Sequence, residues 1–422
     1  MKFLYIYIFL LLPMAFNFSG LEMLKLKVFD VFVSTPEPSG NFAVLNITEA
    51  DVEEQLGWPF PRTVLANLQE DMMEKGALGV GWVISFPQPG RWNGDKLFSL
   101  VANKHPVVFA MFESPNREYP KTTGTVIMGE DIGGYLASGT IQNTPQLQIN
   151  QGIVSAPIDV DGLLRRMPLL MRTPDGWIPS FAVQSLKTLT GGDTYIIKTN
   201  ENGLENVRIP GLPPIPVDSL GRKWVSWVKP IETTMDDMDV AGKFVFVGVT
   251  AKGVMPQIST PAGLMYPHHI QAAFAESLIN QNSPIIKDYA PAVEMLVFTA
   301  VLGLVYASIT FLSVALGILG AIAVWLATGL TGAYLINTGM LLDVSWSLVA
   351  SVVMGAGAFY FRFKEQWQLR QQIKKQFEHY LDPRQVAELQ KNPNKLKLGG
   401  DRAYATFLFT DVRGFTSLSN SL

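Results

Sequence analysis

The clearest pattern in the chain is a long apolar stretch near its C-terminal end. Residues 289–361 contain no Lys or Arg, and only Glu294 and Asp343 interrupt their apolar character. A membrane crossing takes about 20 residues, so the stretch predicts three transmembrane helices, near residues 291–309, 312–335 and 344–362. Because both acidic residues fall near predicted helix ends, we interpret them as interfacial residues rather than as part of an ion pathway.

Residues 20–290 follow a different pattern, in which apolar β-like runs alternate with amphipathic helical segments. Such alternation predicts an α/β domain. The expected strands are 42–47, 80–84, 106–111 and 243–249, and the expected helices are 62–75, 181–189 and 268–280.

A third pattern follows the last predicted crossing. Residues 362–381 contain no Gly or Pro, and an apolar residue recurs at every fourth position, at Leu369, Ile373, Phe377 and Leu381. This spacing predicts a helix that continues from the crossing and ends before Pro383. Either two such helices pair in a parallel dimer, or one helix lies on anionic lipid. Because the helix follows the crossing directly, we favour the dimer.

The distribution of charge predicts how the chain is oriented. Residues 20–290 carry 21 Lys and Arg against 28 Asp and Glu, whereas residues 362–422 carry 11 against 6. Basic residues gather on the cytoplasmic side of membranes, so we expect the C-terminal tail in the cytoplasm and residues 20–290 outside. The chain contains no cysteine, which excludes disulfides and thiolate metal sites.

The N-terminal segment is apolar from Phe3 to Phe18 after Lys2. Residues 15–20 fit a signal-peptide cleavage site poorly, so an uncleaved anchor is favoured over a cleaved signal peptide. Four crossings would place both termini inside, in a protein of the plasma membrane.

Candidate chemistry lies at the C-terminal end. A β-prone run, 404–409, ends in Thr410 and Asp411; Arg413-Gly414 then turns the chain into a helix start capped by Thr416 or Ser417. A carboxylate followed by a turn and a helix N-terminus suits a metal-bound polyphosphate. The alternative is an edge strand with a solvated aspartate.

The run Phe409-Thr-Asp-Val-Arg-Gly-Phe-Thr416 resembles the entry strand of class III nucleotidyl cyclases. The resemblance implies that Asp411 binds two Mg or Mn ions, that the carbonyl of Val412 helps to hold one, and that Phe415 and Thr416 contact the triphosphate. It also implies a homodimer that converts ATP to cyclic AMP and pyrophosphate. The family's other catalytic residues would lie beyond Leu422, so we expect this chain alone to be inactive.

Several residues of the α/β domain are candidates for binding. Asp159-Val-Asp161-Gly162 predicts a tight turn that joins two strands, and calcium is rejected because Leu170 stands where a calcium loop needs Glu. Arg165-Arg166 could bind an anion, but we interpret the pair as a solvated face. His268-His269 is interpreted as a helix start rather than a metal site, because adjacent helical side chains diverge.

Two further signals are weighed and set aside. Tryptophans such as Trp58, Trp82 and Trp92 are expected to fill the core rather than a pocket. Gly79-Val-Gly81 lacks the third glycine of a dinucleotide-binding loop, so a Rossmann-type cofactor site is not expected there.

Other stretches resemble the second type of CHASE sensory domain, an extracellular module of bacterial cyclases and histidine kinases. They are residues 58–62, 159–168, 179–180, 246–248 and 260–261. The resemblance covers residues 20 to about 362, but Gly81-Trp82 departs from the family's Gly-[Phe/Leu]-Asp. It implies an unknown extracytoplasmic signal.

These patterns together predict an anchor (1–19), a sensor domain (20–290), three transmembrane helices (291–362), a linker and coupling segment (363–400) and the start of an α+β cyclase domain (401–422). The expected function is a membrane adenylate cyclase. A non-catalytic sensor or dimerisation receptor and a guanylate cyclase remain alternatives. Nucleic-acid binding is not expected, because membrane topology explains the basic tail.

Overall fold

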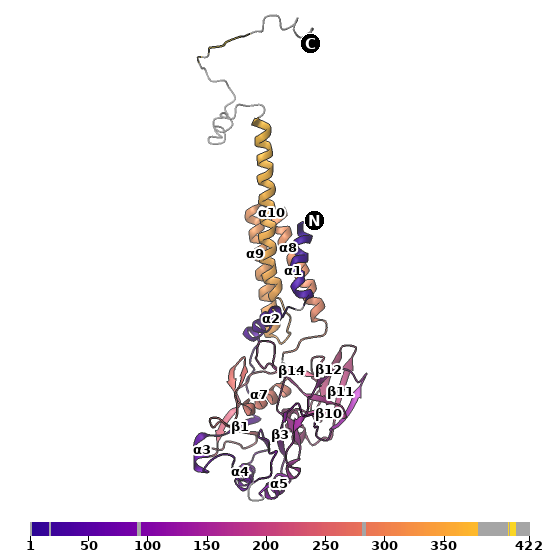
Figure 1. The fold of residues 1–422 in the computed structure, drawn as a ribbon, viewed down its shortest axis with the longest axis vertical. Helices are drawn as coiled ribbons and strands as arrows, with labels where there is room; N and C mark the ends of the chain where they lie inside the picture. Colours follow the sequence, from indigo (N-terminus) through magenta and orange to yellow (C-terminus); the bar gives the residue numbers. More distant parts are fainter. Residues whose placement is uncertain are drawn as a thin grey trace. The chain divides into compact units, whose positions relative to one another are not determined.

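The computed structural model describes residues 2–16, 18–90, 94–280, 284–378, 404 and 406–410. It divides into two compact units, Met1–Ala358 and Phe359–Leu422. The first unit contains an α/β domain and a group of apolar helices (Figure 1). The predicted α/β class of this domain is confirmed.

The α/β domain is built around a seven-stranded sheet in the order β15-β1-β16-β2-β3-β6, with β7 also paired to β3. Its strands are parallel except for the β3–β6 pair. They are β1 (Phe42–Ile47), β2 (Gly79–Trp82), β3 (Val107–Glu113), β6 (Thr140–Ile141), β7 (Gln151–Ile153), β15 (Ile231–Thr234) and β16 (Phe244–Val249). All four predicted strands are present.

Helices cover both faces of this sheet, because the central strands are apolar on both sides. Val44 and Phe246 pack with one set of helices, α6 (Phe181–Thr190) and α7 (Pro267–Ile279). Their sequence neighbours Leu45 and Val247 pack with the opposite set, α4 (Arg62–Glu74) and α5 (Asp95–Ala102). A short helix, α3 (Glu49–Glu54), follows β1.

Smaller sheets extend the domain. They contain β4 (Gly124–Met128), β11 (Thr194–Asn200), β12 (Gly203–Arg208) and β13 (Ile215–Pro216); β5 (Tyr135–Leu136), β9 (Leu170–Thr173) and β10 (Gly176–Pro179); β8 (Arg166–Pro168) and β14 (Arg222–Trp224); and β17 (Ile258–Thr260) and β18 (Gly263–Met265). The β8–β14 pair is antiparallel and carries much of the site described below.

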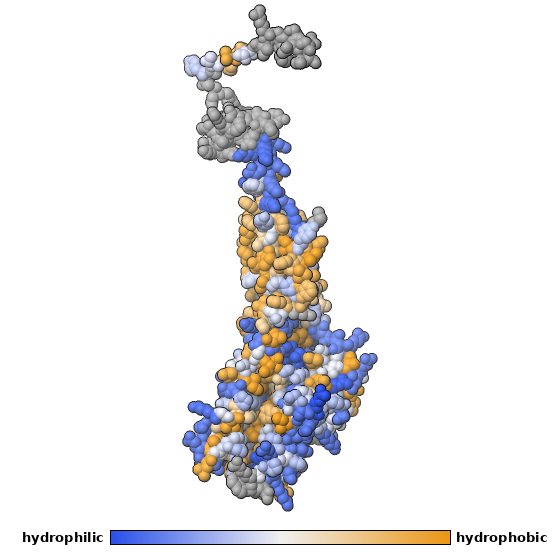
Figure 2. All heavy atoms as spheres, in the orientation of Figure 1, coloured by the Kyte–Doolittle hydropathy of each residue, from blue (hydrophilic) through white to orange (hydrophobic). Residues whose placement is uncertain are grey.

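Three apolar helices near the C-terminal end are long enough to cross a membrane: α8 (Ala290–Phe311), α9 (Val314–Asn337) and α10 (Ser345–Glu378). Their apolar side chains colour this part of the first unit orange in Figure 2. The prediction of three such helices is confirmed, and the charged segment predicted to continue the last one is helical through Glu378.

The N-terminal segment forms two helices, α1 (Lys2–Ala15) and α2 (Ser19–Phe32), where one anchor was expected. Neither helix is long enough to cross a membrane by itself. Together they are long enough, but they meet at a bend of 81°. α1 packs beside α8 and α10: Tyr7 Oη lies 2.9 Å from Thr299 Oγ1, and Trp346 Nε1 donates to the Leu10 carbonyl at 3.1 Å.

The β-prone run before Asp411 does not form a strand within the described residues 404 and 406–410. Tyr404, Phe407 and Phe409 are exposed. A strand needs partners for its backbone N–H and C=O groups, and the described residues of this unit supply none.

A buried histidine fixes how closely α7 approaches the sheet. His268 is fully buried, and its Nε2 lies 2.8 Å from Asn46 Oδ1 of β1. Burial, with a smaller effect from His269, lowers the pKa of His268 well below its ordinary value, so the ring is neutral. Its side chain occupies the space beside Gly248, where an added Cβ would overlap the His268 imidazole.

Gly248→Ala is therefore expected to destabilise the α/β domain by about 1–3 kcal/mol, because neither β16 nor the buried ring can move freely. Thermal unfolding of the detergent-solubilised protein measures the effect. Gly303→Ala in α8 is the control, since an added Cβ there meets nothing within 4 Å. Equal unfolding temperatures for the two variants would contradict this packing.

Candidate functional site

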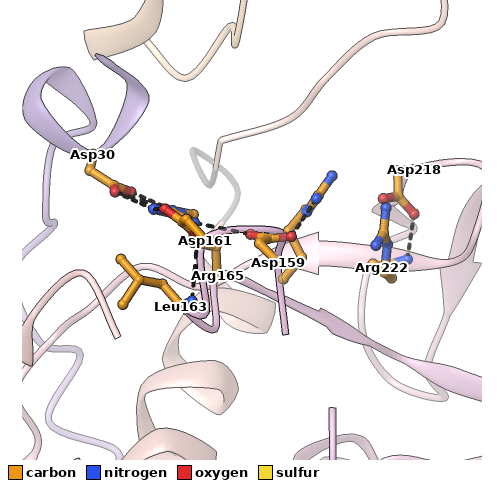
Figure 3. A network of polar contacts seen from close by, with 8 residues as sticks. Asp30, Asp159, Asp161, Leu163, Arg165, Asp218 and Arg222 are labelled. Atoms are coloured by element: carbon orange, nitrogen blue, oxygen red, sulfur yellow. Dashed lines mark hydrogen bonds and ion pairs between the residues drawn. The ribbon is translucent and has the colours of Figure 1, made fainter. Parts of the chain in front are cut away.

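The most concentrated polar site in the described residues surrounds Arg165 (Figure 3). Its guanidinium is fully buried. It donates to Asp30 at 2.9 and 2.7 Å, to Asp161 at 2.7 Å through two nitrogens, and to Asp159 at 3.4 Å. Arg166 also contacts Asp159. Two of these carboxylates come from the loop before β8, whereas Asp30 comes from α2.

The electrostatics of the site keep Arg165 and Asp161 ionised. Burial alone would lower the pKa of Arg165, but the hydrogen bonds and charges of Asp161 and Asp30 outweigh burial and raise this pKa above its ordinary value. The hydrogen bond from Arg165 lowers the pKa of Asp161, against an opposing effect of burial. A buried guanidinium with bidentate carboxylate partners is a strong, directional contact.

The loop before β8 explains how the two aspartates reach Arg165. The Gly162 N–H donates to the Asp159 carbonyl at 2.9 Å, and Gly162 has a φ of +83°, a conformation that favours glycine. The predicted tight turn is present. However, it lies between β7 and β8, which do not pair, so the expectation that it joins two paired strands is wrong.

The interpretation of Arg165-Arg166 as a solvated face is also wrong. Sequence spacing could not place Asp30 beside Arg165, because the two residues are 135 positions apart. A signal was nevertheless present: Asp159 and Asp161 precede the arginine pair closely enough to reach it within one turn. No group of acidic and histidine residues that could hold a metal ion occurs in the described part of the chain.

Helix α2 is the element that the sequence analysis missed. Leu26 and Phe29, three positions apart, form a buried apolar face that packs with Trp224 of β14, with Ile336 near the end of α9 and with Leu341 in the segment after α9. The Phe29 and Trp224 rings meet edge to face at 6.0 Å. This spacing is the helical signal that was available in the sequence.

Charged residues on α2 reach in two directions. Asp30 binds Arg165 of the α/β domain, and Lys25 lies 3.9 Å from Glu294 of α8. Glu294 also accepts the N–H of Asp343 at 2.8 Å, just before α10. One short helix therefore contacts the α/β domain and the membrane helices.

A groove beside α2 could admit a small molecule. It has a volume of about 140 Å³ and is lined by Asp30, Val33, Thr35, Trp224, Trp227 and residues 261–262. The Trp227 Nε1–H is buried and has no hydrogen-bond partner in the described part of the structure. A ligand here would touch Asp30 and Trp224 directly.

The residues predicted to bind metal and phosphate lie outside the part of the chain that the structure describes. They are Asp411, Val412, Phe415 and Thr416; Pro383 and Trp92 also lie outside it. By contrast, Trp82 is buried in the core and donates to Gln69 at 2.8 Å, as expected of a core tryptophan. His268 and His269 lie in the first turn of α7, which confirms their interpretation as helix-start residues.

Asp30→Asn is expected to loosen α2, because the variant removes one of the charges that compensate a buried guanidinium. Hydrogen exchange of the amides of α2 should become about 5- to 150-fold faster, corresponding to a loss of about 1–3 kcal/mol. The control is Arg222→Gln, which breaks the local Arg222–Asp218 pair without touching α2 (Figure 3). Unchanged exchange in Asp30→Asn would contradict the role given to this contact.

Comparison with known proteins identifies the family of this chain. The sequence model of the CHASE2 domain matches residues 6–309, from within α1 to near the end of α8. The match therefore includes α2 and the whole Arg165 site, but not α9 or α10. No curated protein and no solved structure matches the chain. Because the match spans well over half of the sequence, this membrane protein belongs to the CHASE2 domain family, whose domains are extracytoplasmic sensors.

Proposed function

We propose that this protein is a membrane-bound sensor adenylate cyclase that converts ATP to cyclic AMP and pyrophosphate. The observation that carries the catalytic half is the run from Phe409 to Thr416, with its carboxylate, turn and helix cap in the order of a class III entry strand. Asp411 and the carbonyl of Val412 would hold Mg or Mn, and the N–H groups of Phe415 and Thr416 would meet the triphosphate. The metal ions would neutralise charge on the polyphosphate.

The orientation that we propose places residues 20–290 outside the plasma membrane and both termini in the cytoplasm. Support comes from the basic residues that follow the apolar part of α10, which are Arg362, Lys364, Arg370, Lys374 and Lys375. Such residues favour the cytoplasmic side. Lys2 at the start of α1 agrees with this arrangement.

The signal would travel first through α2 and then along α10. A change in the α/β domain would reach α2 through Asp30 and Trp224, and α2 would pass it to the membrane helices through Glu294 and Ile336. Helix α10 is 34 residues long and continues from apolar to charged sequence without interruption. Paired in a homodimer, two such helices could rotate or slide and so change the interface between catalytic domains.

Asp411→Asn is expected to reduce cyclic AMP formation by at least ~100-fold, because it removes the carboxylate that would bind the metal ions. The measurement is cyclic AMP production by membranes from cells that express the natural reading frame, with membrane insertion checked by immunoblot. Asp401→Asn is the matched control, since it removes a carboxylate outside the motif.

Normal activity in Asp411→Asn would contradict the assignment of Asp411 as a metal ligand. If the wild-type protein formed cyclic GMP from GTP instead, the fold and mechanism would stand and the substrate would change. If it formed neither nucleotide, the protein would be a non-catalytic membrane sensor or dimerisation receptor.

The rotation of α10 can be tested by insertions between Gln371 and Gln372. An insertion of seven residues keeps the same face of each helix toward its partner, because it adds one whole heptad. An insertion of four residues turns that face by about half a turn relative to the heptad repeat. We expect the seven-residue insertion to keep near-normal cyclic AMP production and the four-residue insertion to change it several-fold. Equal activities in both insertions would argue against paired helices and would favour a helix lying on lipid.

A further inference from the structure

Helix α2 is directed almost at right angles to α1. The contacts of α1 follow α8 step by step, since the Phe3 and Tyr306 ring centroids lie 5.2 Å apart and Tyr7 Oη lies 2.9 Å from Thr299 Oγ1. α1 therefore runs antiparallel beside α8, a helix long enough to cross a membrane. Because the bend between α1 and α2 is 81°, α2 is directed along the membrane surface rather than across it (Figure 1).

The contacts of α2 place it level with one end of the apolar helices. Its Lys25 lies 3.9 Å from Glu294, in the second turn of α8. Just after α2, the Ser34 hydroxyl donates to the carbonyl of Asn337, the last residue of α9, at 3.2 Å. α8 begins and α9 ends at this level, so α2 lies where the apolar helices meet the α/β domain.

Exposed aromatic side chains gather at the same level. Tyr289 directly precedes α8, Tyr334 lies in the last turn of α9, and both are exposed. Phe18 and Phe32, at the two ends of α2, are exposed as well. Aromatic residues are enriched where a membrane meets water. The level of α2 is therefore that of the lipid headgroups.

One face of α2 is not covered by the described part of the protein. Leu26 and Phe29 form the buried face, whereas Val31 lies on the opposite face and is 74% exposed. Lys27, four positions earlier on that face, is exposed, and its ammonium has no ion-pair partner among the described residues. An apolar side chain beside such a lysine suits lipid, because the ammonium can extend to the phosphates while the apolar group enters the acyl chains.

We propose that α2 is an interfacial helix that docks on the phospholipid of the membrane. Phe18, Val31 and Phe32 enter the boundary between headgroups and acyl chains, and the ammonium of Lys27 meets a lipid phosphate. Continuity with the membrane helices identifies lipid as the occupant of the exposed face. α2 begins four residues after α1 ends, and it contacts both α8 and the end of α9.

The lipid contact lies next to the contact with the α/β domain. Val31 directly follows Asp30, the partner of Arg165, and Phe29 packs on Trp224. A single helix of 14 residues therefore carries the ion pairs on one side and the lipid-facing residues on another. The inference concerns lipid binding alone and stands whether or not the protein makes cyclic AMP.

Fluorescence quenching by labelled lipids tests the position of α2. The chain contains no cysteine, so a single introduced cysteine can carry a small fluorescent probe. Val31→Cys and Phe32→Cys are labelled separately in the full chain and reconstituted in vesicles of phosphatidylcholine and phosphatidylglycerol. We expect lipid that carries a nitroxide near its headgroup to quench both probes several-fold more strongly than it quenches a probe at Leu100→Cys. Leu100 is the matched control, because it is an exposed apolar residue on α5, far from α2 (Figure 1).

A second control measures depth. Ala300→Cys, exposed at the middle of α8, should be quenched best by a nitroxide near the end of the acyl chain. If the probes at positions 31 and 32 are quenched no more than the probe at position 100, α2 faces water and the inference is overturned. If they are quenched best by the deep nitroxide, as at position 300, α2 is part of a crossing rather than an interfacial helix, which also overturns it.

Discussion

The arrangement of this protein depends on one buried guanidinium. Arg165 has no exposed surface, so its charge is tolerated only because three carboxylates surround it. Two of them, Asp159 and Asp161, come from its own loop. Asp30 is different, because it belongs to α2. The requirement to neutralise Arg165 therefore holds a membrane-proximal helix against the α/β domain.

Apolar packing makes this ionic contact directional. Phe29 and Leu26 fix the face of α2 that meets Trp224 and Ile336, while Lys25 approaches Glu294 of α8. A small helix with attachments to two bodies is a suitable part for a sensor, because a shift in either body changes the contacts of the other. The groove beside Asp30 and Trp227 lies where a ligand would act on these contacts.

Much of the fold was predictable, because its elements repeat strong local patterns. The strand at 42–47 was predicted without error, and the apolar helices followed from the absence of charge over 289–361. The candidate site was not predictable in the same way. Arg165 and Asp30 are joined by the tertiary structure over 135 residues, and α2 is short and only partly apolar, so its signal was weak beside that of the N-terminal run. The assignments at Asp411 and Thr416 rest on sequence alone and stay predictions.

The most direct test of this account is a double-mutant cycle between Asp30 and Arg165. Asp30→Asn, Arg165→Met and the double variant would be compared by the opening free energy of the α2 amides, measured by hydrogen exchange. If Arg165 holds α2 through Asp30, the two effects are non-additive by about 1–3 kcal/mol. Effects that add to within about 0.5 kcal/mol would show that α2 is held independently of Arg165, and the proposed route from sensor domain to membrane would be contradicted.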